Sequence, residues 1–417
     1  MATITGVTLE KAQQIEDDSV ILAFRTTESN LILQTKGGTQ FNAGSLIDAV
    51  PVTLRQGIVS VGSFDRAPED VLINEWNIGA ANVKLANPAS LPPNSGNGVA
   101  WSPDGVYLAI SHVASPYLSV YKRAGDVLTK LANPSTLPAG DGNGLAWSPD
   151  GKYLAVTILA ANYIVIYKRS GDTFTKLADP TTLPTGLGQG VSWSPDGQYL
   201  CVCHAGAPYV TIYKRNGDVF TKLSDPAGLP SAKAYGPAWS PDGRYLAIGY
   251  SSGDSIKFSV YKCSGDTFTR LADPASMPPG TVFCVSWSPD GQYLALSHGF
   301  SPFVSIYKRS GDVFTKLPNP ASLPTGTAYG LVWSPDGLYL AVAHDVSPFI
   351  TVYERTGDVF TKLLNPATLP TGIGTSTSWS PDGVYLAAAH NITPYFSAYK
   401  SAMGAIQDPV IAILPRT

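Results

Sequence analysis

The stretch Trp-Ser-Pro-Asp-Gly, first met at residues 101–105, decides the fold of this 417-residue chain. The same five residues begin again at six later tryptophans: Trp147, Trp193, Trp239, Trp287, Trp333 and Trp379. Successive copies are 46 residues apart, except for the 48 residues between Trp239 and Trp287. A repeat of this length with several strand-like runs is typical of one blade of a β-propeller. The sequence therefore predicts an all-β protein with seven blades.

One repeat shows the four strands expected in each blade. Residues 144–148 form an apolar run that ends in Pro-Asp-Gly, a turn signal. Residues 153–157, 163–168 and 173–177 are rich in β-branched and aromatic side chains, as strands are. We name these four strands A, B, C and D, from the inside of the ring to the outside. Each blade is thus expected to be a four-stranded antiparallel sheet.

The inner strands carry apolar or small residues on both faces. In strand B of the first repeat, Leu108 and Ile110 share one face, whereas Tyr107, Ala109 and Ser111 share the other. A sheet that is apolar on both faces needs a neighbour on each side, which a ring of blades provides.

The ends of the ring indicate how it closes. Residues 83–92 match the D strand and the following connection of later repeats, yet they precede the first repeat tryptophan. The last repeat changes character after Lys400, at the end of its strand C. We expect residues 82–86 to supply strand D of the last blade, so that no sheet edge stays open. A competing interpretation gives that place to the tail between Ile406 and Leu414.

The chain divides into a module at residues 1–50, a connector at 51–70 and the propeller at 71–417. The module is expected to be mainly β. Residues 9–17 predict a short helix, residues 19–25 a strand, and residues 29–46 a strand, a Gly-Gly turn and a short strand.

The repeat resembles the WD-repeat superfamily in its broad sense, specifically propellers whose blades carry a Ser-Pro-Asp-Gly turn. The resemblance covers residues 71–400, but the Gly-His and Trp-Asp dipeptides of signalling WD proteins are absent. It implies the fold and leaves the function open, because propellers include enzymes, receptors and scaffolds.

The N-terminal module resembles one found near the ends of tail and fibre proteins of tailed phages. The matching residues are Leu31, Ile32, Leu33, Thr35, Gly38, Thr39, Asn42, Ala43 and Gly44. This resemblance implies a virion protein that attaches to other virion proteins through residues 1–70 and forms homo-oligomers in the particle. An unrelated β-hairpin cap on the propeller is the alternative.

The five histidines all occupy one position of the repeat, eleven residues after the tryptophan, where strand B ends. An aromatic residue follows five positions later in six copies. The candidate ligand-binding pairs are His112 with Tyr117, His204 with Tyr209, His298 with Phe303, His344 with Phe349, and His390 with Tyr395. Rings that stack on sugars and imidazoles that form hydrogen bonds would make a ring of shallow glycan sites. In the structural alternative the histidines only pack between blades, as Ile158 and Tyr250 do at the same position.

The residue four positions before each repeat tryptophan varies more than its surroundings. It is Asn97, Asn143, Gln189, Tyr235, Phe283, Tyr329 or Thr375, and it should border the mouth of the central channel. Tyr235 and Tyr329 are therefore added to the ligand-binding candidates. Drift in a solvent-exposed loop is the competing explanation.

The sequence offers no candidate catalytic residue, metal ligand or cofactor site. The aspartates of the Pro-Asp-Gly turns suit their turns, and we find no nucleophilic triad or phosphate-binding loop. Equivalent histidines on neighbouring blades should lie roughly 10 Å apart, too far to share a zinc ion. Cys201, Cys203, Cys263 and Cys284 are expected to be free thiols. The Lys-Arg pairs that end strand C are interpreted as a solvated, charge-balanced rim.

Composition excludes several classes of partner. Charged residues make up 14% of the chain and the net charge is −3, which gives no reason to expect nucleic acid as a partner. The first residues lack the layout of a secretory signal, and no apolar run is long enough to span a membrane.

Three functional hypotheses remain. The first is a phage virion protein of tail or fibre type, made in the host cytoplasm, whose propeller binds a host-surface receptor, most simply a glycan. The second is an architectural or decoration protein of the virion that uses the propeller as a protein-docking disc. The third is a hydrolase with its site at the channel mouth.

Overall fold

The computed structural model describes residues 82–251 and 256–401, and outside these ranges only short strands. The chain divides into two compact units. One unit is Asn82–Ser401, and the other combines Met1–Ala81 with Ala402–Thr417. Every regular element within the described residues is a strand.

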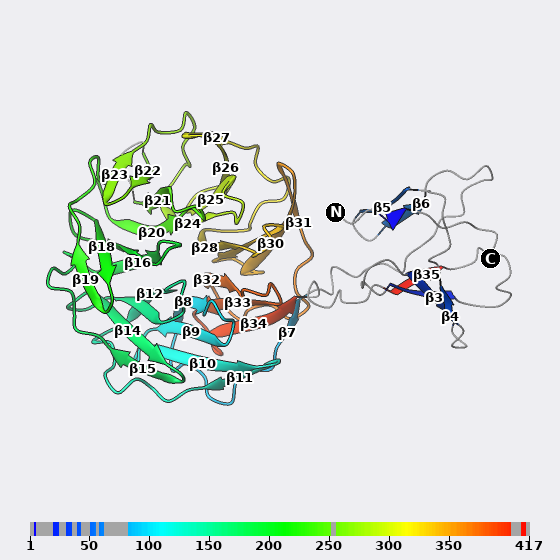
Figure 1. Cartoon of the computed structure of the whole chain (residues 1–417), viewed down its shortest axis with the longest axis horizontal. Coiled ribbons are helices and arrows are strands. Elements are labelled where there is room, and N and C mark those ends of the chain that lie inside the picture. The colour runs from blue at the N-terminus through cyan, green and yellow to red at the C-terminus, as the bar shows by residue number, and fades with distance from the viewer. Residues whose placement is uncertain are drawn as a thin grey trace. The chain divides into compact units, whose positions relative to one another are not determined.

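The unit Asn82–Ser401 is a seven-bladed propeller of four-stranded antiparallel sheets, as the repeat predicts (Figure 1). The A strands lie nearest the middle of the ring; they are β8 (Gly96–Trp101), β12 (Gly142–Trp147), β16 (Gly188–Trp193), β20 (Ala234–Trp239), β24 (Val282–Trp287), β28 (Ala328–Trp333) and β32 (Gly374–Trp379). The B strands follow; they are β9 (Tyr107–His112), β13 (Tyr153–Ile158), β17 (Tyr199–His204), β21 (Tyr245–Tyr250), β25 (Tyr293–His298), β29 (Tyr339–His344) and β33 (Tyr385–His390).

The outer two strands complete each blade. The C strands are β10 (Leu118–Ala124), β14 (Ile164–Ser170), β18 (Val210–Asn216), β22 (Phe258–Ser264), β26 (Val304–Ser310), β30 (Ile350–Thr356) and β34 (Phe396–Ser401). The D strands are β11 (Val127–Lys130), β15 (Thr173–Lys176), β19 (Val219–Lys222), β23 (Thr267–Arg270), β27 (Val313–Lys316), β31 (Val359–Lys362) and β7 (Asn82–Lys84). The D–A connections and the B–C loops share one side of the ring, which we call the loop face. The A–B and C–D turns share the opposite side, the turn face.

The Ser-Pro-Asp-Gly turn is held by its own side chains. In the first blade the Ser102 hydroxyl donates to Asp104 Oδ1 over 2.5 Å and accepts the Tyr107 amide over 2.8 Å. Asp104 Oδ1 also accepts the Val106 amide, and Gly105 adopts a φ of 66° that favours glycine. The repeated aspartates are thus occupied in their own turns, which explains their presence in all seven copies.

Neighbouring blades are joined on the turn face by a recurring set of contacts that we call the interblade clasp. Between blades 1 and 2, the Tyr107 hydroxyl donates to Asp172 Oδ1 over 2.5 Å, and Lys122 Nζ lies 2.8 Å from Asp172 Oδ2. Burial first, and then the Asp172 carboxylate, raises the pKa of Tyr107 to about 12, so the phenol keeps its proton. The same tyrosine-to-aspartate bond recurs at six interfaces: Tyr107–Asp172, Tyr153–Asp218, Tyr199–Asp266, Tyr245–Asp312, Tyr293–Asp358 and Tyr385–Asp126.

The arginines of the Lys-Arg pairs belong to the clasp, and interpreting them as part of a solvated rim was wrong. Arg169 Cζ lies 4.8 Å from the Tyr107 ring centre and 5.7 Å from that of Trp147. Its Nη1 also lies 2.8 Å from Asp104 Oδ2 in the preceding blade. The guanidinium is planar and weakly hydrated, so it can stack on rings while it pairs with a carboxylate. Only the lysines, such as Lys122, are half exposed as expected.

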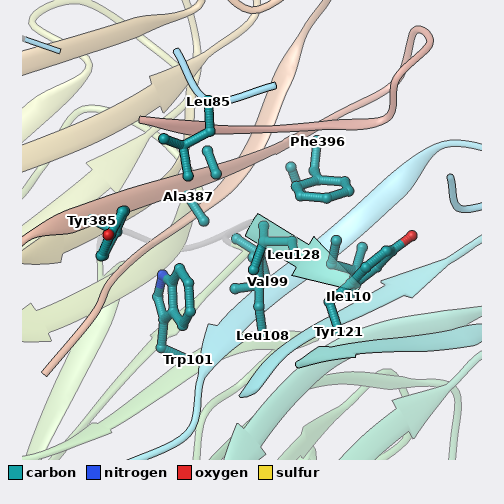
Figure 2. Packing of buried hydrophobic residues seen from close by; sticks show 12 residues of the cluster. Leu85, Val99, Trp101, Leu108, Ile110, Tyr121, Leu128, Tyr385, Ala387 and Phe396 are labelled. Atoms are coloured by element: carbon teal, nitrogen blue, oxygen red, sulfur yellow. The ribbon is translucent and has the colours of Figure 1, made fainter. Parts of the chain in front are cut away.

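The ring closes as predicted, with β7 pairing to β34 in the last blade. Lys84 lies opposite Tyr399, and the Leu85 amide donates to Ala398 O over 2.8 Å. The Leu85 side chain is 9% exposed and packs into the apolar cluster between blades 7 and 1, with Val99 and Phe396 (Figure 2).

The interface between blades 6 and 7 departs from the clasp, because strands C and D of blade 7 come from opposite ends of the chain. No Gly-Asp turn joins them, and in the described part of the chain no partner is found for the Tyr339 hydroxyl. Glu354 replaces the lysine that would pair with the missing aspartate, and Ser401 replaces the arginine. The register places Asn82 where other D strands have an apolar residue such as Phe174. We call this interface the seam.

The other unit contains two small sheets. In one, β1 (Ile4–Thr5), β5 (Pro51–Arg55) and β6 (Ile58–Val61) pair in the order β1-β5-β6, so strands occupy part of the expected connector. The other has the order β35-β2-β3-β4, with β35 (Val410–Ile413), β2 (Val20–Phe24), β3 (Leu31–Thr35) and β4 (Gln40–Asn42). The tail strand β35 pairs with β2, which excludes it from strand D of the last blade. The helix expected at residues 9–17 lies outside the described residues.

Closure of the ring predicts unequal effects of two neighbouring substitutions. Leu85→Ala should lower the free energy of unfolding by about 2–5 kcal/mol, because it opens a cavity in the cluster between blades 7 and 1. Val83→Ala, at a side chain that is 65% exposed, should change it by less than about 0.5 kcal/mol. Urea unfolding followed by tryptophan fluorescence measures both. Equal effects would contradict the assigned closure.

Candidate functional site

The five histidines at the ends of the B strands are fully buried, with 0% exposure. In each, Nε2 faces a hydroxyl of strand C seven residues later, at 2.9–3.1 Å. In four of them Nδ1 lies 2.7–3.1 Å from the carbonyl oxygen two residues along, in the B–C loop. His344 Nδ1 faces the Thr325 hydroxyl at 3.5 Å. The imidazoles therefore join strand B, strand C and the loop within one blade.

The partners of the ring nitrogens determine the form of the imidazole. A carbonyl oxygen only accepts, so Nδ1 carries the proton in those four blades, and Nε2 accepts from the serine or threonine hydroxyl. Burial lowers the pKa of all five to about 4, and the loop carbonyls only partly oppose this shift. The histidines are neutral at pH 7.

The two blades without histidine show how this arrangement is exchanged as a unit. In blade 2 Ile158 takes the histidine position, and Val165 takes the position of the hydroxyl. In blade 4 the Tyr250 and Ser259 hydroxyls lie 3.0 Å apart. The residue at the end of strand B and the residue seven positions later in strand C are thus either both polar or both apolar. This pairing within a blade favours the structural alternative for the histidines.

The aromatic residues that follow the histidines are half-buried at the start of strand C. Each has a positive φ, between 58° and 70°: Tyr117, Tyr163, Tyr209, Phe303, Phe349 and Tyr395. The five preceded by proline follow a cis peptide bond. Their rings retain some exposed surface on the loop face, whereas the imidazoles have none, so a ligand can reach the rings and not the imidazoles.

The variable residues at the second position of the A strands form a ring of side chains around the propeller axis, which we call the collar. Its members are Asn97, Asn143, Gln189, Tyr235, Phe283, Tyr329 and Thr375. A glycine brings neighbouring members together: a Cβ on Gly98 would lie 2.7 Å from Asn143 O, and one on Gly144 would lie 2.6 Å from Gln189 O. In these two blades only a residue without a side chain permits this approach of adjacent A strands, whereas Cys284 and Ser376 take the same position in blades 5 and 7.

One arc of the collar is polar. Asn97 Nδ2 donates to Gly142 O over 2.8 Å, and Thr375 Oγ1 donates to Gly96 O over 2.8 Å. Asn143 Nδ2 donates to Gly188 O over 3.1 Å. These bonds fix the side chains between successive blades and use the amide nitrogens. Within the described residues no donor reaches Oδ1 of Asn97, so this oxygen can accept a hydrogen bond from a ligand hydroxyl.

The other arc is aromatic and spans blades 4 to 6. The Tyr235 and Phe283 ring centres are 5.2 Å apart in an edge-to-face contact, and Phe283 lies 5.2 Å from Tyr329. All three rings are half-buried. Burial raises the pKa of Tyr235 and Tyr329, so both phenols keep their protons. Neither hydroxyl has a partner among the described residues.

Lys233 is a further component of this arc that sequence reasoning missed. Its Nζ lies 4.7 Å from the Tyr235 ring centre, and burial lowers its pKa. The sequence could have revealed Lys233 by its position, because lysines and arginines are rare in the D–A connections.

No other chemistry gathers in the described part of the chain. All four cysteines are free thiols, as predicted. Burial raises the pKa of Cys203, Cys263 and Cys284, which makes these thiols unreactive. The described residues contain no group of three potential metal ligands, and none of them forms a helix able to cross a membrane.

Comparison with known proteins supports the fold. Residues 276–299 match the family model "WD domain, G-beta repeat". The hydrazine synthase of Kuenenia stuttgartiensis is similar at a TM-score of 0.59 and 19% identity, over 75% of this chain and 98% of that one. The Cps50 (Swd1) β-propeller domain of Myceliophteria thermophila is similar at a TM-score of 0.56 and 12% identity, over 77% and 99% of the two chains. No curated protein sequence matches. One segment of the propeller thus resembles a WD repeat, and at these identities the likeness to the solved structures concerns the fold alone.

The buried histidines predict loss of stability in mild acid. The unfolded chain binds a proton at each histidine near pH 6.5, whereas the folded chain does so only near pH 4. Stability contributed by the neutral imidazoles is therefore full above pH 6.5 and falls as the pH drops from 6.5 to 4. Each histidine contributes a slope of about 1.4 kcal/mol per pH unit in that window. The clasp aspartates have a lowered pKa in the folded chain, so the stability that they contribute is lost only below pH 3.8, outside this window.

A variant that copies blade 2 provides the control. The double substitution His204→Ile and Thr211→Val should reduce the slope of unfolding free energy against pH, between pH 6.5 and 4, by the contribution of one histidine. Urea unfolding between pH 7 and pH 4 measures the slopes. An unchanged slope in the variant would show that His204 titrates normally in the folded chain.

Proposed function

We propose that this chain is a non-enzymatic binding protein that holds a saccharide at the collar of its propeller and serves as a receptor-binding component of a tailed-phage virion. The observation that carries the binding proposal is the division of the collar into an aromatic arc and a polar arc around one axis. Three adjoining rings supply apolar faces, and amide and hydroxyl groups lie opposite them.

This combination suits the chemistry of a sugar. A pyranose ring has C–H faces that pack on aromatic rings, and a rim of hydroxyls that need donors and acceptors. The unpartnered phenols of Tyr235 and Tyr329 are available as donors, and Asn97 Oδ1 as an acceptor. Because these side chains are held by neighbouring blades, little conformational entropy is lost when a ligand binds.

The virion location rests on the resemblance of the N-terminal module to phage tail and fibre proteins. Strands β3 and β4 lie within residues 31–44, the segment that carries that resemblance. In this proposal the module attaches the protein to other virion proteins as a homo-oligomer, and several propellers then bind a host surface together. Repetition converts weak single sites into useful avidity.

A second candidate, protein docking in an architectural role, is favoured by exposed apolar side chains on the loop face. Phe300 is 65% exposed, Val346 48% and Ile392 52%, and all three occupy the same B–C loop position in consecutive blades. Neighbouring exposed apolar side chains of this kind are typical of protein contacts.

The collar proposal predicts that the paired substitutions Tyr235→Ala and Tyr329→Ala weaken saccharide binding by tenfold or more. Each removes a stacking face and a hydroxyl, and tenfold corresponds to about 1.4 kcal/mol. Binding of the full chain to immobilised bacterial polysaccharides measures the effect, with thermal unfolding as the check on folding.

Two control variants separate the alternatives. Tyr117→Ala with Tyr395→Ala should leave saccharide binding within about twofold; a loss confined to this pair would move the site to the B–C loops. Phe300→Ser should also leave it intact. Loss of particle assembly with Phe300→Ser, with no saccharide binding in the parent chain, would establish protein docking instead.

The virion proposal has a separate test. An antibody against the propeller should label the tails of purified particles of the encoding phage in electron micrographs. Particles that lack the protein would exclude this role without affecting the collar.

A further inference from the structure

Blade 4 carries the basic residues of the loop face, together with the acidic Asp254 in its B–C loop. Among the D–A connections and B–C loops of all seven repeats, the sequence places only two lysines or arginines, Lys233 and Lys257. Both belong to blade 4, which also has the two-residue insertion and Tyr250 in place of histidine. The cationic character of this face is therefore concentrated at one end of the aromatic arc.

Lys233 differs from the lysines of the turn face in its surroundings. Those lysines pair with clasp aspartates at 2.7–3.0 Å, and their side chains are 42–50% exposed. Lys233 is half-buried, and its recorded partner is the Tyr235 ring, 4.7 Å from Nζ. No carboxylate of the described residues forms an ion pair with it. Its ammonium group thus loses hydration without gaining a counter-charge from the described residues.

The backbone keeps this lysine in place at the channel mouth. The Ser251 amide donates to Lys233 O over 2.9 Å, and the Ser251 hydroxyl donates to the same oxygen over 3.3 Å. Strand β20 begins one residue later, at Ala234, so Lys233 and the collar member Tyr235 both lie at the start of this strand. The ammonium is therefore held beside the collar ring.

We propose that Lys233 binds an anionic substituent of the saccharide held at the collar, so that the preferred ligand is an acidic polysaccharide. This inference rests on the proposed function and adds the charge of the ligand. While the sugar ring packs on the aromatic arc, its carboxylate or sulfate accepts a charge-assisted hydrogen bond from Lys233 Nζ. Partial burial strengthens that bond relative to one in open solvent.

The test compares four polymers on the full chain: polygalacturonate, the same polymer after carboxyl reduction, dextran sulfate and dextran. We expect polygalacturonate or dextran sulfate to bind more tightly than its neutral counterpart, and binding to weaken as salt increases. Lys233→Gln should reduce binding of the anionic polymer on the order of tenfold, and of the neutral one by less than about twofold. Lys152→Gln, an exposed lysine on the turn face, should change neither.

The outcomes distinguish the two proposals. Preference for polygalacturonate identifies a carboxylate ligand, and preference for dextran sulfate identifies a sulfate or related anion. Equal binding of charged and neutral polymers, or an unchanged affinity in Lys233→Gln, overturns the role of Lys233 and leaves saccharide binding intact. Binding of none of the four polymers, with a folded propeller, counts against both proposals.

Discussion

The fold depends on the interblade clasp, in which a tyrosine at the start of strand B donates across to the aspartate of the next blade. An exposed lysine–aspartate pair alone contributes little. The clasp gains its strength from combining such a pair with a buried phenol and an arginine stacked on two rings, as Tyr107, Asp172 and Arg169 show. Each blade must place its clasp residues level with those of both neighbours, so residues on the turn face can vary little. This requirement explains why the Ser-Pro-Asp-Gly turn is nearly identical in all seven blades and the Gly-Asp turn in the six blades that have it.

The seam, where the clasp is missing, shows which residues the clasp requires. Where blade 7 has no Gly-Asp turn, the lysine that would pair with it is replaced by Glu354. The hydroxyl of the partner tyrosine, Tyr339, has no partner among the described residues. The substitutions are coordinated, since a lysine there would have no counter-charge. The closing strand β7 compensates by placing Leu85 in the cluster on the other side of blade 7. The ring is therefore held unequally around its circumference, and local opening should begin at the seam.

The sequence predicted the parts of the structure that are repeated, because seven copies of one pattern reinforce each other. It also predicted closure by residues 82–86 and the position of the collar, where variation in an otherwise uniform repeat was the signal. The role of the histidines was harder to assign. A histidine at a strand end suits a binding surface as well as a buried link. Only the residue seven positions later, a hydroxyl opposite histidine and Val165 opposite Ile158, would have distinguished them. The stacking of Arg169 was also hidden, since sequence does not show which face of a neighbouring blade a side chain meets.

The same reasoning supports placing the proposed ligand site on the loop face. Residues on the turn face form the clasp, and residues of the B strands pack between sheets. A substitution at either kind of position therefore weakens the interfaces with both neighbouring blades. The collar side chains take no part in the clasp or in the packing between sheets, although those of its polar arc form hydrogen bonds to a neighbouring blade. Their identity varies from asparagine to tyrosine. Blade 4 carries this freedom furthest: it combines a lysine at the mouth, a lengthened B–C loop and Cys263 in place of the clasp arginine. A blade that gives up a clasp contact while gaining a lysine at the channel mouth departs from what the stability of the ring requires, and the proposed ligand at the collar would account for that departure.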